Sequence, residues 1–139
     1  MTNIHATSVL IDDNHAVLIR GASGSGKSNL ALKLIDNGAI LISDDQTIIE
    51  NSEGSIWAKT APNIAGLLEV RGIGIVEVDH APQGILVLII DLQSPVAERI
   101  PDPAFELIAD TKIRRAVIDP NDPMALKKIN IALKLALND

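Results

Sequence analysis

The sequence contains no cysteine and no tyrosine, and its aromatic residues are limited to Trp57 and Phe105. The absence of cysteine excludes disulfide bonds, cysteine-ligated zinc and a thiol nucleophile. Apolar residues make up 47% of the chain, so a hydrophobic core is available, but it has to be aliphatic. A core of isoleucine, leucine, valine and alanine is typical of a largely buried α/β sheet.

Positive charge is also scarce. Twelve Lys and Arg residues face eighteen Asp and Glu residues, which gives a formal net charge of −6. No run of basic residues interrupts this balance, and binding to a nucleic-acid backbone depends on concentrated positive charge. We therefore expect no nucleic-acid partner.

Long hydrophobic runs are missing as well. The N-terminal segment MTNIHATSVL has neither the basic region nor the apolar region of a signal peptide. The longest strongly apolar run, residues 85–90, is far shorter than the ~20 residues of a membrane span. We expect a cytoplasmic protein with no membrane partner, and the length predicts one domain over residues 1–139.

The pattern of apolar and turn residues predicts an α/β fold that is rich in strands. A continuous apolar run over residues 85–91 is typical of a central strand. One helix is expected over residues 27–37, closed by Gly38, and another over residues 124–137, capped by Asp122. Further strands are expected over residues 4–11, 16–20, 39–43, 47–50, 55–59, 67–70, 75–78 and 112–119.

The motif GASGSGKS fits G-x-x-x-x-G-K-[ST] at every defined position, between a predicted strand and a predicted helix. Its glycines permit a tight backbone path around a phosphate, and the helix adds its positive end. Lysine and serine at the end of the motif reach the β- and γ-phosphates and Mg²⁺, respectively. We therefore expect ATP and Mg²⁺ to bind at eight residues: Gly21, Ala22, Ser23, Gly24, Ser25, Gly26, Lys27 and Ser28.

Two apolar runs end in carboxylates, and either could supply the acidic metal ligand of such a site. The run ILVLIID ends at Asp91, whose longer strand makes it the better candidate by pattern alone. The run AILISDD ends in Asp44 and Asp45, whose adjacent carboxylates repel each other. Placing both near a metal–phosphate site therefore needs a reason: one could act at the metal while the other accepts a proton. The alternatives are a solvated loop start for this pair and a plain turn residue for Asp91.

Three segments together resemble the catalytic C-terminal domain of bacterial HPr kinase/phosphorylase, in the short α-proteobacterial form without the N-terminal domain. They are IHATSVLIDDNHAVLIRGASGSGKS, the helix and strand that lead to LISDD, and LLEVRGIGIVEV. The resemblance implies a compact P-loop fold similar to the nucleotide-binding part of phosphoenolpyruvate carboxykinase. It also implies a regulatory kinase that phosphorylates a serine of HPr, a small carrier protein of the phosphotransferase system. The family can run the reverse, phosphate-dependent reaction.

The resemblance also implies roles for particular residues. Asp45 matches the residue that takes the proton of the acceptor serine, and Asp44 is its neighbour near the metal. Lys27 neutralises phosphate charge, and His5 matches a histidine of the catalytic site.

The segment LLEVRGIGIVEV supplies two further candidates. By resemblance, Glu69 is the second protein ligand to Mg²⁺ beside Ser28. Arg71 lies two residues farther on the same side of an extended segment, so both side chains could face the metal and the phosphates. From the residues alone, a cross-strand ion pair between Glu69 and Arg71 is the alternative.

The chain departs from the family pattern before its last helix. Longer members carry a catalytic arginine there, whereas residues 119–123 read DPNDP. An anionic loop is a poor place to hold inorganic phosphate, so we expect kinase activity and argue against phosphorylase activity. A nucleotide-sensing regulator without phosphotransfer is also compatible with the motifs. A small-molecule kinase fits them less well, because no arginine-rich lid is visible in the sequence. Longer members of the family form hexamers, so a homo-oligomer of this chain is an open possibility.

Overall fold

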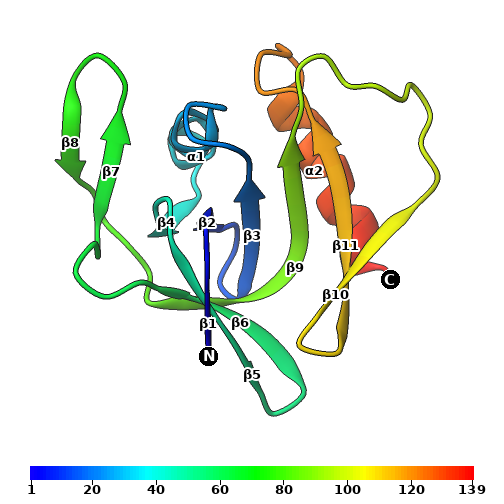
Figure 1. Cartoon of the computed structure of the whole chain (residues 1–139), viewed down its shortest axis with the longest axis horizontal. Coiled ribbons are helices and arrows are strands. Elements are labelled where there is room, and N and C mark those ends of the chain that lie inside the picture. Colours follow the sequence, from blue (N-terminus) through cyan, green and yellow to red (C-terminus); the bar gives the residue numbers. More distant parts are fainter.

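A computed structural model describes all residues from 1 to 139. It contains eleven strands and two helices, arranged as a nine-stranded sheet and a separate two-stranded sheet (Figure 1). The strand-rich α/β class expected from the sequence is confirmed. No helix is both long enough and apolar enough to cross a membrane.

The elements follow one another as β1 (Thr2–Ile4), β2 (Ala6–Leu10), β3 (His15–Arg20), α1 (Lys27–Asp36), β4 (Ile40–Ser43), β5 (Thr47–Ser52), β6 (Ser55–Thr60), β7 (Leu67–Val70), β8 (Gly74–Glu77), β9 (Gln83–Leu92), β10 (Ala104–Ile108), β11 (Thr111–Ile118) and α2 (Ala125–Leu137).

Strand β9 organises the main sheet, as its continuous apolar sequence predicts. Its first residues pair antiparallel with β6, and its later residues pair parallel with β3 on one side and with β11 on the other. Because β3, β9 and β11 run in the same direction, their carboxyl ends lie at one edge of the sheet (Figure 1). The phosphate-binding motif leaves β3 at this edge.

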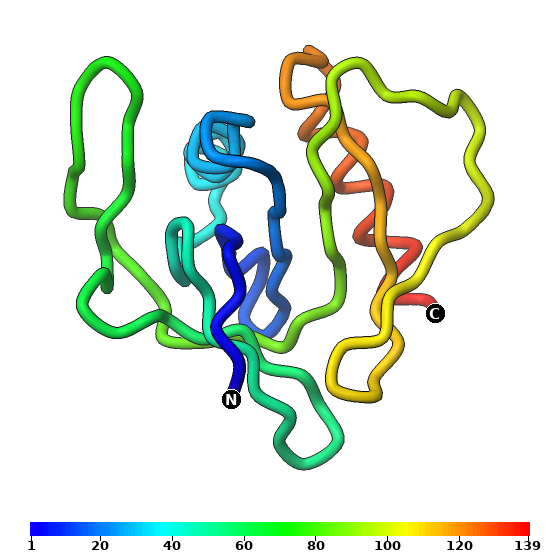
Figure 2. The backbone as a smooth tube through the Cα atoms, viewed as in Figure 1, coloured from blue at the N-terminus to red at the C-terminus, as the bar shows by residue number.

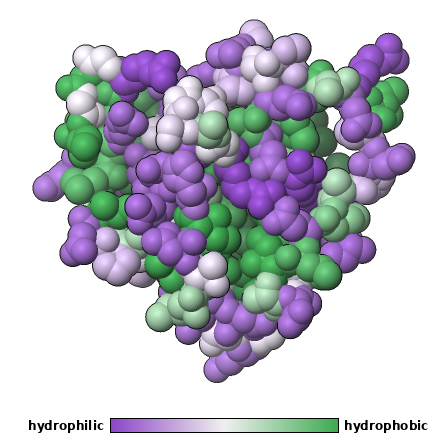
Figure 3. All heavy atoms as spheres, in the orientation of Figure 1, coloured by the Kyte–Doolittle hydropathy of each residue, from purple (hydrophilic) through white to green (hydrophobic).

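The core is aliphatic and lies on both faces of the sheet. Both helices pack on one face, where residues such as Ile19, Leu30 and Ile129 are fully buried or nearly so. Alternate residues of β3, such as Leu18, face a second cluster that includes residues of β5, β6 and β10. On the surface seen in Figure 3, hydrophilic and hydrophobic residues are intermixed.

The expected strand over residues 4–11 is wrong as a single element. Strand β1 pairs with β5, whereas β2 pairs with β3 and β4, and the chain bends at His5 between them. The spacing of apolar residues does not show which strand each segment pairs with, so it does not reveal a change of neighbouring strand. The break places His5 at the edge where β4 ends.

Two other boundaries differ from the sequence prediction. Strand β10, whose only partner strand is β11, was not predicted from the sequence; it follows the long connection after β9 (Figure 2). Helix α2 begins at Ala125, because Asp122 caps the preceding turn: its carboxylate accepts a hydrogen bond from Met124 N–H at 2.8 Å. Gly38, with φ 104°, follows α1 as expected.

Candidate active site

The loop between β3 and α1 has the geometry of an anion cradle. Gly24 and Gly26 have φ angles of 80° and 107°, which side chains with a Cβ rarely adopt. Within α1 the N–H of Leu30 bonds Gly26 O at 2.9 Å, so the amides of residues 27–29 precede the first helical hydrogen bond. These amides and the positive end of the helix suit a phosphate group.

The side chains of this loop also suit a polyphosphate. Lys27 is 5% exposed, and its Nζ donates to the carbonyl oxygens of Gly21 at 2.9 Å and Ala22 at 3.3 Å. Ser25 Oγ is buried without a hydrogen-bond partner. A Cβ on Gly21 would lie 2.3 Å from Ser25 Oγ, so the loop closes in this way only around glycine. A phosphate would satisfy these donors.

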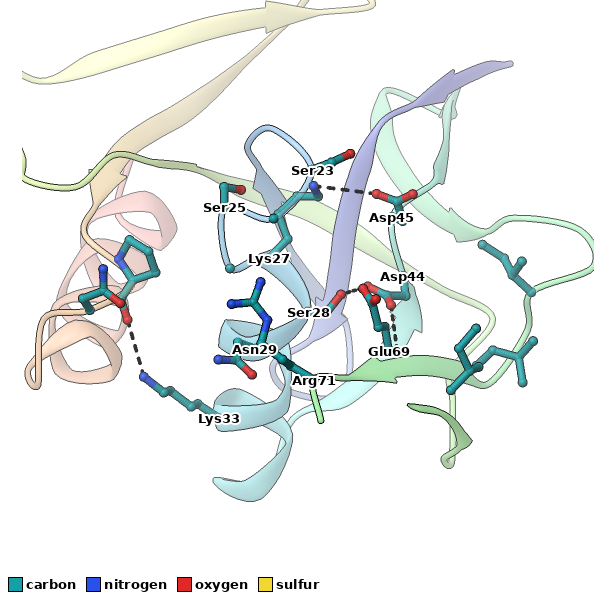
Figure 4. A pocket seen from close by; sticks show the side chains of 17 residues that line it. Ser23, Ser25, Lys27, Ser28, Asn29, Lys33, Asp44, Asp45, Glu69 and Arg71 are labelled. Atoms are coloured by element: carbon teal, nitrogen blue, oxygen red, sulfur yellow. Dashed lines mark hydrogen bonds and ion pairs between the residues drawn. The ribbon is translucent and has the colours of Figure 1, made fainter. Parts of the chain in front are cut away.

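Asp44 is a buried hydrogen-bond acceptor for three different elements. Its Oδ1 accepts from Thr7 Oγ1 of β2 at 2.9 Å and from Ser28 Oγ of α1 at 2.8 Å. Its Oδ2 accepts from Glu69 N–H of β7 at 3.0 Å. Asp44 is 8% exposed, so its carboxylate holds together the two residues expected at the metal (Figure 4).

Asp45 has different surroundings from its neighbour. Its side chain is 57% exposed, and its Oδ1 lies 2.6 Å from His5 Nε2 and 3.7 Å from Lys27 Nζ. Its backbone N–H donates to Thr7 Oγ1 at 3.0 Å. Asp45 has φ 65°, a left-handed conformation that costs about 1–2 kcal/mol for a residue with a Cβ. This turn of the backbone sends the two adjacent carboxylates to separate partners.

Glu69 and Arg71 come from the two-stranded sheet of β7 and β8. The cross-strand partner of Glu69 is Ile75, and Arg71 lies in the turn beyond β7, so the alternative of a cross-strand ion pair is wrong. Both side chains line the same pocket as the phosphate loop (Figure 4).

The pocket has a volume of about 720 Å³ and unites segments that are distant in sequence. His5 does not line it but reaches it through Asp45. Gly21 and Ala22 also lie outside the lining, behind Lys27. The lining residues that the sequence singled out are Ser23, Gly24, Ser25, Gly26, Lys27, Ser28, Asp44, Asp45, Glu69 and Arg71.

No group of three or more histidine, aspartate or glutamate side chains converges as a ready metal site. Mg²⁺ is commonly held by one or two carboxylates together with nucleotide phosphates and water. Ser28 and Glu69 beside an anion cradle therefore fit Mg²⁺ that arrives with a nucleotide.

Asp91 does not belong to this pocket, so the preference for it as the acidic metal ligand is wrong. Arg20 donates two hydrogen bonds to it, at 2.8 and 2.9 Å, and Arg115 donates another. Burial opposes ionisation of Asp91, but the hydrogen bonds from both arginines hold its pKa below the usual value. Arg20 also holds Glu106, at 2.7 Å, and lowers the pKa of that carboxyl.

The two aspartates of the loop over residues 119–123 do not line the pocket. Asp119 and Asp122 accept hydrogen bonds from the backbone N–H two residues later. Pro120 and Asn121 line the pocket instead, and Lys33 Nζ lies 3.4 Å from Pro120 O (Figure 4).

Thr7 is the polar contact that the sequence did not reveal. It lies in the apolar segment IHATSVLI, where a lone threonine is unremarkable for a strand. Its contacts with Asp44 and Asp45 depend on the pairing of β2 with β4.

The chain is similar in sequence and in fold to known proteins. The chain matches the family model of the HPr serine kinase C-terminal domain over residues 1–85. It is 42% identical over 79 residues to HPr kinase/phosphorylase of Streptococcus thermophilus and 36% identical over 116 residues to that of Xylella fastidiosa. These alignments cover 55% and 78% of this chain but only 25% and 36% of the relatives.

The structure of the HPr(Ser) kinase/phosphatase from Coxiella burnetii matches with a TM-score of 0.85 and 25% identity. The match covers 99% of this chain and 92% of that chain. The fold is therefore the P-loop kinase fold expected from the sequence resemblance. The chain belongs to the HPr serine kinase C-terminal domain family.

Proposed function

We propose that this chain is the catalytic part of an ATP- and Mg²⁺-dependent kinase that phosphorylates a serine of an HPr-type phosphocarrier protein in the cytoplasm. One observation carries the proposal: Asp45, next to Lys27 and His5, stands at the mouth of the phosphate-loop pocket. An exposed carboxylate at this position is what a protein acceptor requires, because the hydroxyl group has to reach it from outside.

The proposed chemistry is a direct transfer. When bound, Mg²⁺ neutralises charge on the β- and γ-phosphates, and Ser28 and Glu69 are the residues to hold it. Lys27 exchanges its contacts with loop carbonyls for the phosphates. Asp45 accepts the serine proton while the serine oxygen bonds to the γ-phosphorus, and the bond from that phosphorus to the β-phosphate oxygen breaks. His5 holds the Asp45 carboxylate in place.

We further propose that the forward reaction dominates over phosphorolysis. The relatives are named kinase/phosphorylase or kinase/phosphatase, but here residues 119–123 contain no arginine. Two lysines contact this loop: Lys128 pairs with Asp122, and Lys33, which lines the pocket, lies with its Nζ 3.4 Å from Pro120 O. A lysine ammonium is a compact point charge and does not bind phosphate through two parallel hydrogen bonds as arginine does. Formation of pyrophosphate from phosphoserine-HPr and inorganic phosphate measures the reverse reaction directly.

The decisive experiment incubates the protein with labelled ATP, Mg²⁺ and the HPr-like proteins of its host, followed by mapping of the modified residue. We expect phosphoserine on one of them. Asp45→Asn should keep ATP affinity while the transfer rate falls by about 10²–10⁴-fold, the usual contribution of a positioned base. Asp13→Asn, an exposed change in the turn between β2 and β3, is the control and should transfer at the normal rate.

A nucleotide-sensing regulator is the competing function, and the altered loop over residues 119–123 is the feature that favours it. Such a regulator would bind ATP with Asp44 and Asp45 dispensable. ATP binding without transfer to any acceptor, unchanged by Asp45→Asn, would therefore replace the kinase proposal.

A further inference from the structure

A single hydroxyl group connects the two adjacent aspartates. Thr7 is fully buried in β2, and its Oγ1 donates to Asp44 Oδ1 at 2.9 Å and accepts from Asp45 N–H at 3.0 Å. A threonine hydroxyl has one hydrogen to donate and lone pairs to accept with. Both capacities are used here, one on each aspartate.

This bridge has a geometric consequence for both carboxylates. The donated hydrogen bond holds Asp44 Oδ1 where Ser28 Oγ also reaches it, at 2.8 Å. The accepted hydrogen bond satisfies the backbone N–H of Asp45 in its left-handed conformation, φ 65°. With that backbone held, the Asp45 side chain extends to His5 and Lys27 rather than toward Asp44.

The position of Thr7 is itself set by the strand that leads to the phosphate loop. Thr7 pairs with Ile19 of β3, one residue before the end of that strand. The pairing of β2 with β4 shifts register between Ser8 and Val9, and such irregularities commonly re-aim side chains beside active sites. The side chain of Thr7 is buried and β-branched, so it has few rotamers. It therefore fixes the position of the end of β4 relative to the strand that leads to the phosphate loop.

We propose that Thr7 is a positioning residue that sets Asp44 toward the metal side and Asp45 toward the acceptor side. This inference rests on the proposed kinase function. Thr7 is fully buried and does not line the pocket, so its effect passes through the two aspartates. Its removal should slow the transfer step more than it weakens the binding of ATP.

The test compares Thr7→Val, Thr7→Ser and Thr47→Val. Valine keeps the shape of the side chain without the hydroxyl, and serine restores the hydroxyl. Thr47 is an equally buried threonine whose Oγ1 donates to Ala6 O at 3.0 Å, and it forms no hydrogen bond with either aspartate. It therefore controls for the general loss of a buried hydroxyl.

For Thr7→Val we expect kcat to fall by about 10- to 100-fold, the scale of a small misplacement of catalytic groups, with KM for ATP little changed. Thr7→Ser should recover most of the rate, and Thr47→Val should keep it. Equal kcat values for Thr7→Val and Thr47→Val would overturn the proposal.

A second readout does not depend on phosphotransfer. Thr7→Val should expose the Asp45 amide to faster hydrogen exchange and reduce the gain in ATP affinity that Mg²⁺ provides, and Thr7→Ser should restore both. If the unmodified protein transfers no phosphate, the kinase proposal fails, while these two measurements still decide the role of Thr7. Unchanged exchange and an unchanged Mg²⁺ effect in Thr7→Val would refute it.

Discussion

At the residue scale, the site depends on two neighbouring aspartates with opposite surroundings. Asp44 is buried and accepts hydrogen bonds from Thr7, Ser28 and the backbone of Glu69. Asp45 is exposed and contacts His5. Because only Asp44 is a buried acceptor, its loss should lower stability more than a change at Asp45.

Asp44→Ala should lower the free energy of unfolding by about 1–3 kcal/mol, because it leaves buried donors without their acceptor. Asp45→Asn, which keeps a side chain that tolerates the left-handed conformation, should change it by less than about 0.5 kcal/mol, the usual range for an exposed site. Urea unfolding followed by circular dichroism measures both. Equal losses in the two variants would contradict the division between a buried anchor and an exposed base.

Gly21→Ala should abolish ATP binding, because the added Cβ would lie 2.3 Å from Ser25 Oγ. Removing that oxygen leaves Ser25 Cβ at 3.1 Å, so the double variant with Ser25→Ala should regain part of the affinity. Isothermal titration with ATP and Mg²⁺ measures this, with Ser25→Ala alone as the control. No recovery in the double variant would show that the contact with Ser25 is not the cause.

At the element scale, a network of charges holds the strands beneath the phosphate loop. Arg20, the last residue of β3, joins Asp91 of β9 to Glu106 of β10, and Arg115 of β11 also pairs with Asp91. The four side chains balance one another in charge. Because both arginines bind the carboxylate of Asp91, this residue links strands of the sheet and does not face the expected metal site.

This network makes stability depend on pH in the acid range. Arg20 and Arg115 lower the pKa of Asp91, and Arg20 lowers that of Glu106. A carboxyl whose pKa is lower in the folded state stabilises the fold above its unfolded pKa. That contribution is lost as pH falls below about 4, where protons bind the unfolded chain first.

Asp91→Asn should therefore reduce the free energy of unfolding near pH 7 by about 1–3 kcal/mol and flatten its decline between pH 5 and pH 3. Urea unfolding across this range measures both effects, with Asp13→Asn as an exposed control. A decline as steep in Asp91→Asn as in the unmodified protein would show that the network is not its source.

At the scale of the whole molecule, the pocket exists because separate parts of the chain fold together. The phosphate loop forms one side, the β7–β8 sheet another, and residues 120 and 121 a third (Figure 1). Leu68, fully buried in the core beneath α1, anchors the small sheet beside this helix. Glu69 is brought to Ser28 by this packing and by its bond to Asp44.

ATP should therefore stabilise the whole fold, and more so with Mg²⁺. A ligand at 100 times its Kd adds about 2.7 kcal/mol to the free energy of unfolding. In Glu69→Gln we expect ATP alone to stabilise as usual, while the additional effect of Mg²⁺ largely disappears. Thermal unfolding with ATP, with ATP and Mg²⁺, and after chelation measures this, and an undiminished Mg²⁺ effect would exclude Glu69 as a ligand.

Local patterns alone predicted much of this protein. The phosphate loop, helix α1, the central strand β9 and the aliphatic core all follow from short-range spacing and composition, because each depends on neighbouring residues. The family followed from three such segments. Strand β10 was not predicted because five residues with a single partner strand carry a weak pattern.

Tertiary structure decided what each acidic residue does. Asp91 and Asp44 both end apolar runs, and the longer run favoured Asp91 as the metal ligand. Arg20 and Arg115 neutralise Asp91, whereas Thr7, Ser28 and Glu69 N–H surround Asp44. These partners come from strands and helices far away in sequence, and only the pairing of the strands brings them within hydrogen-bonding distance.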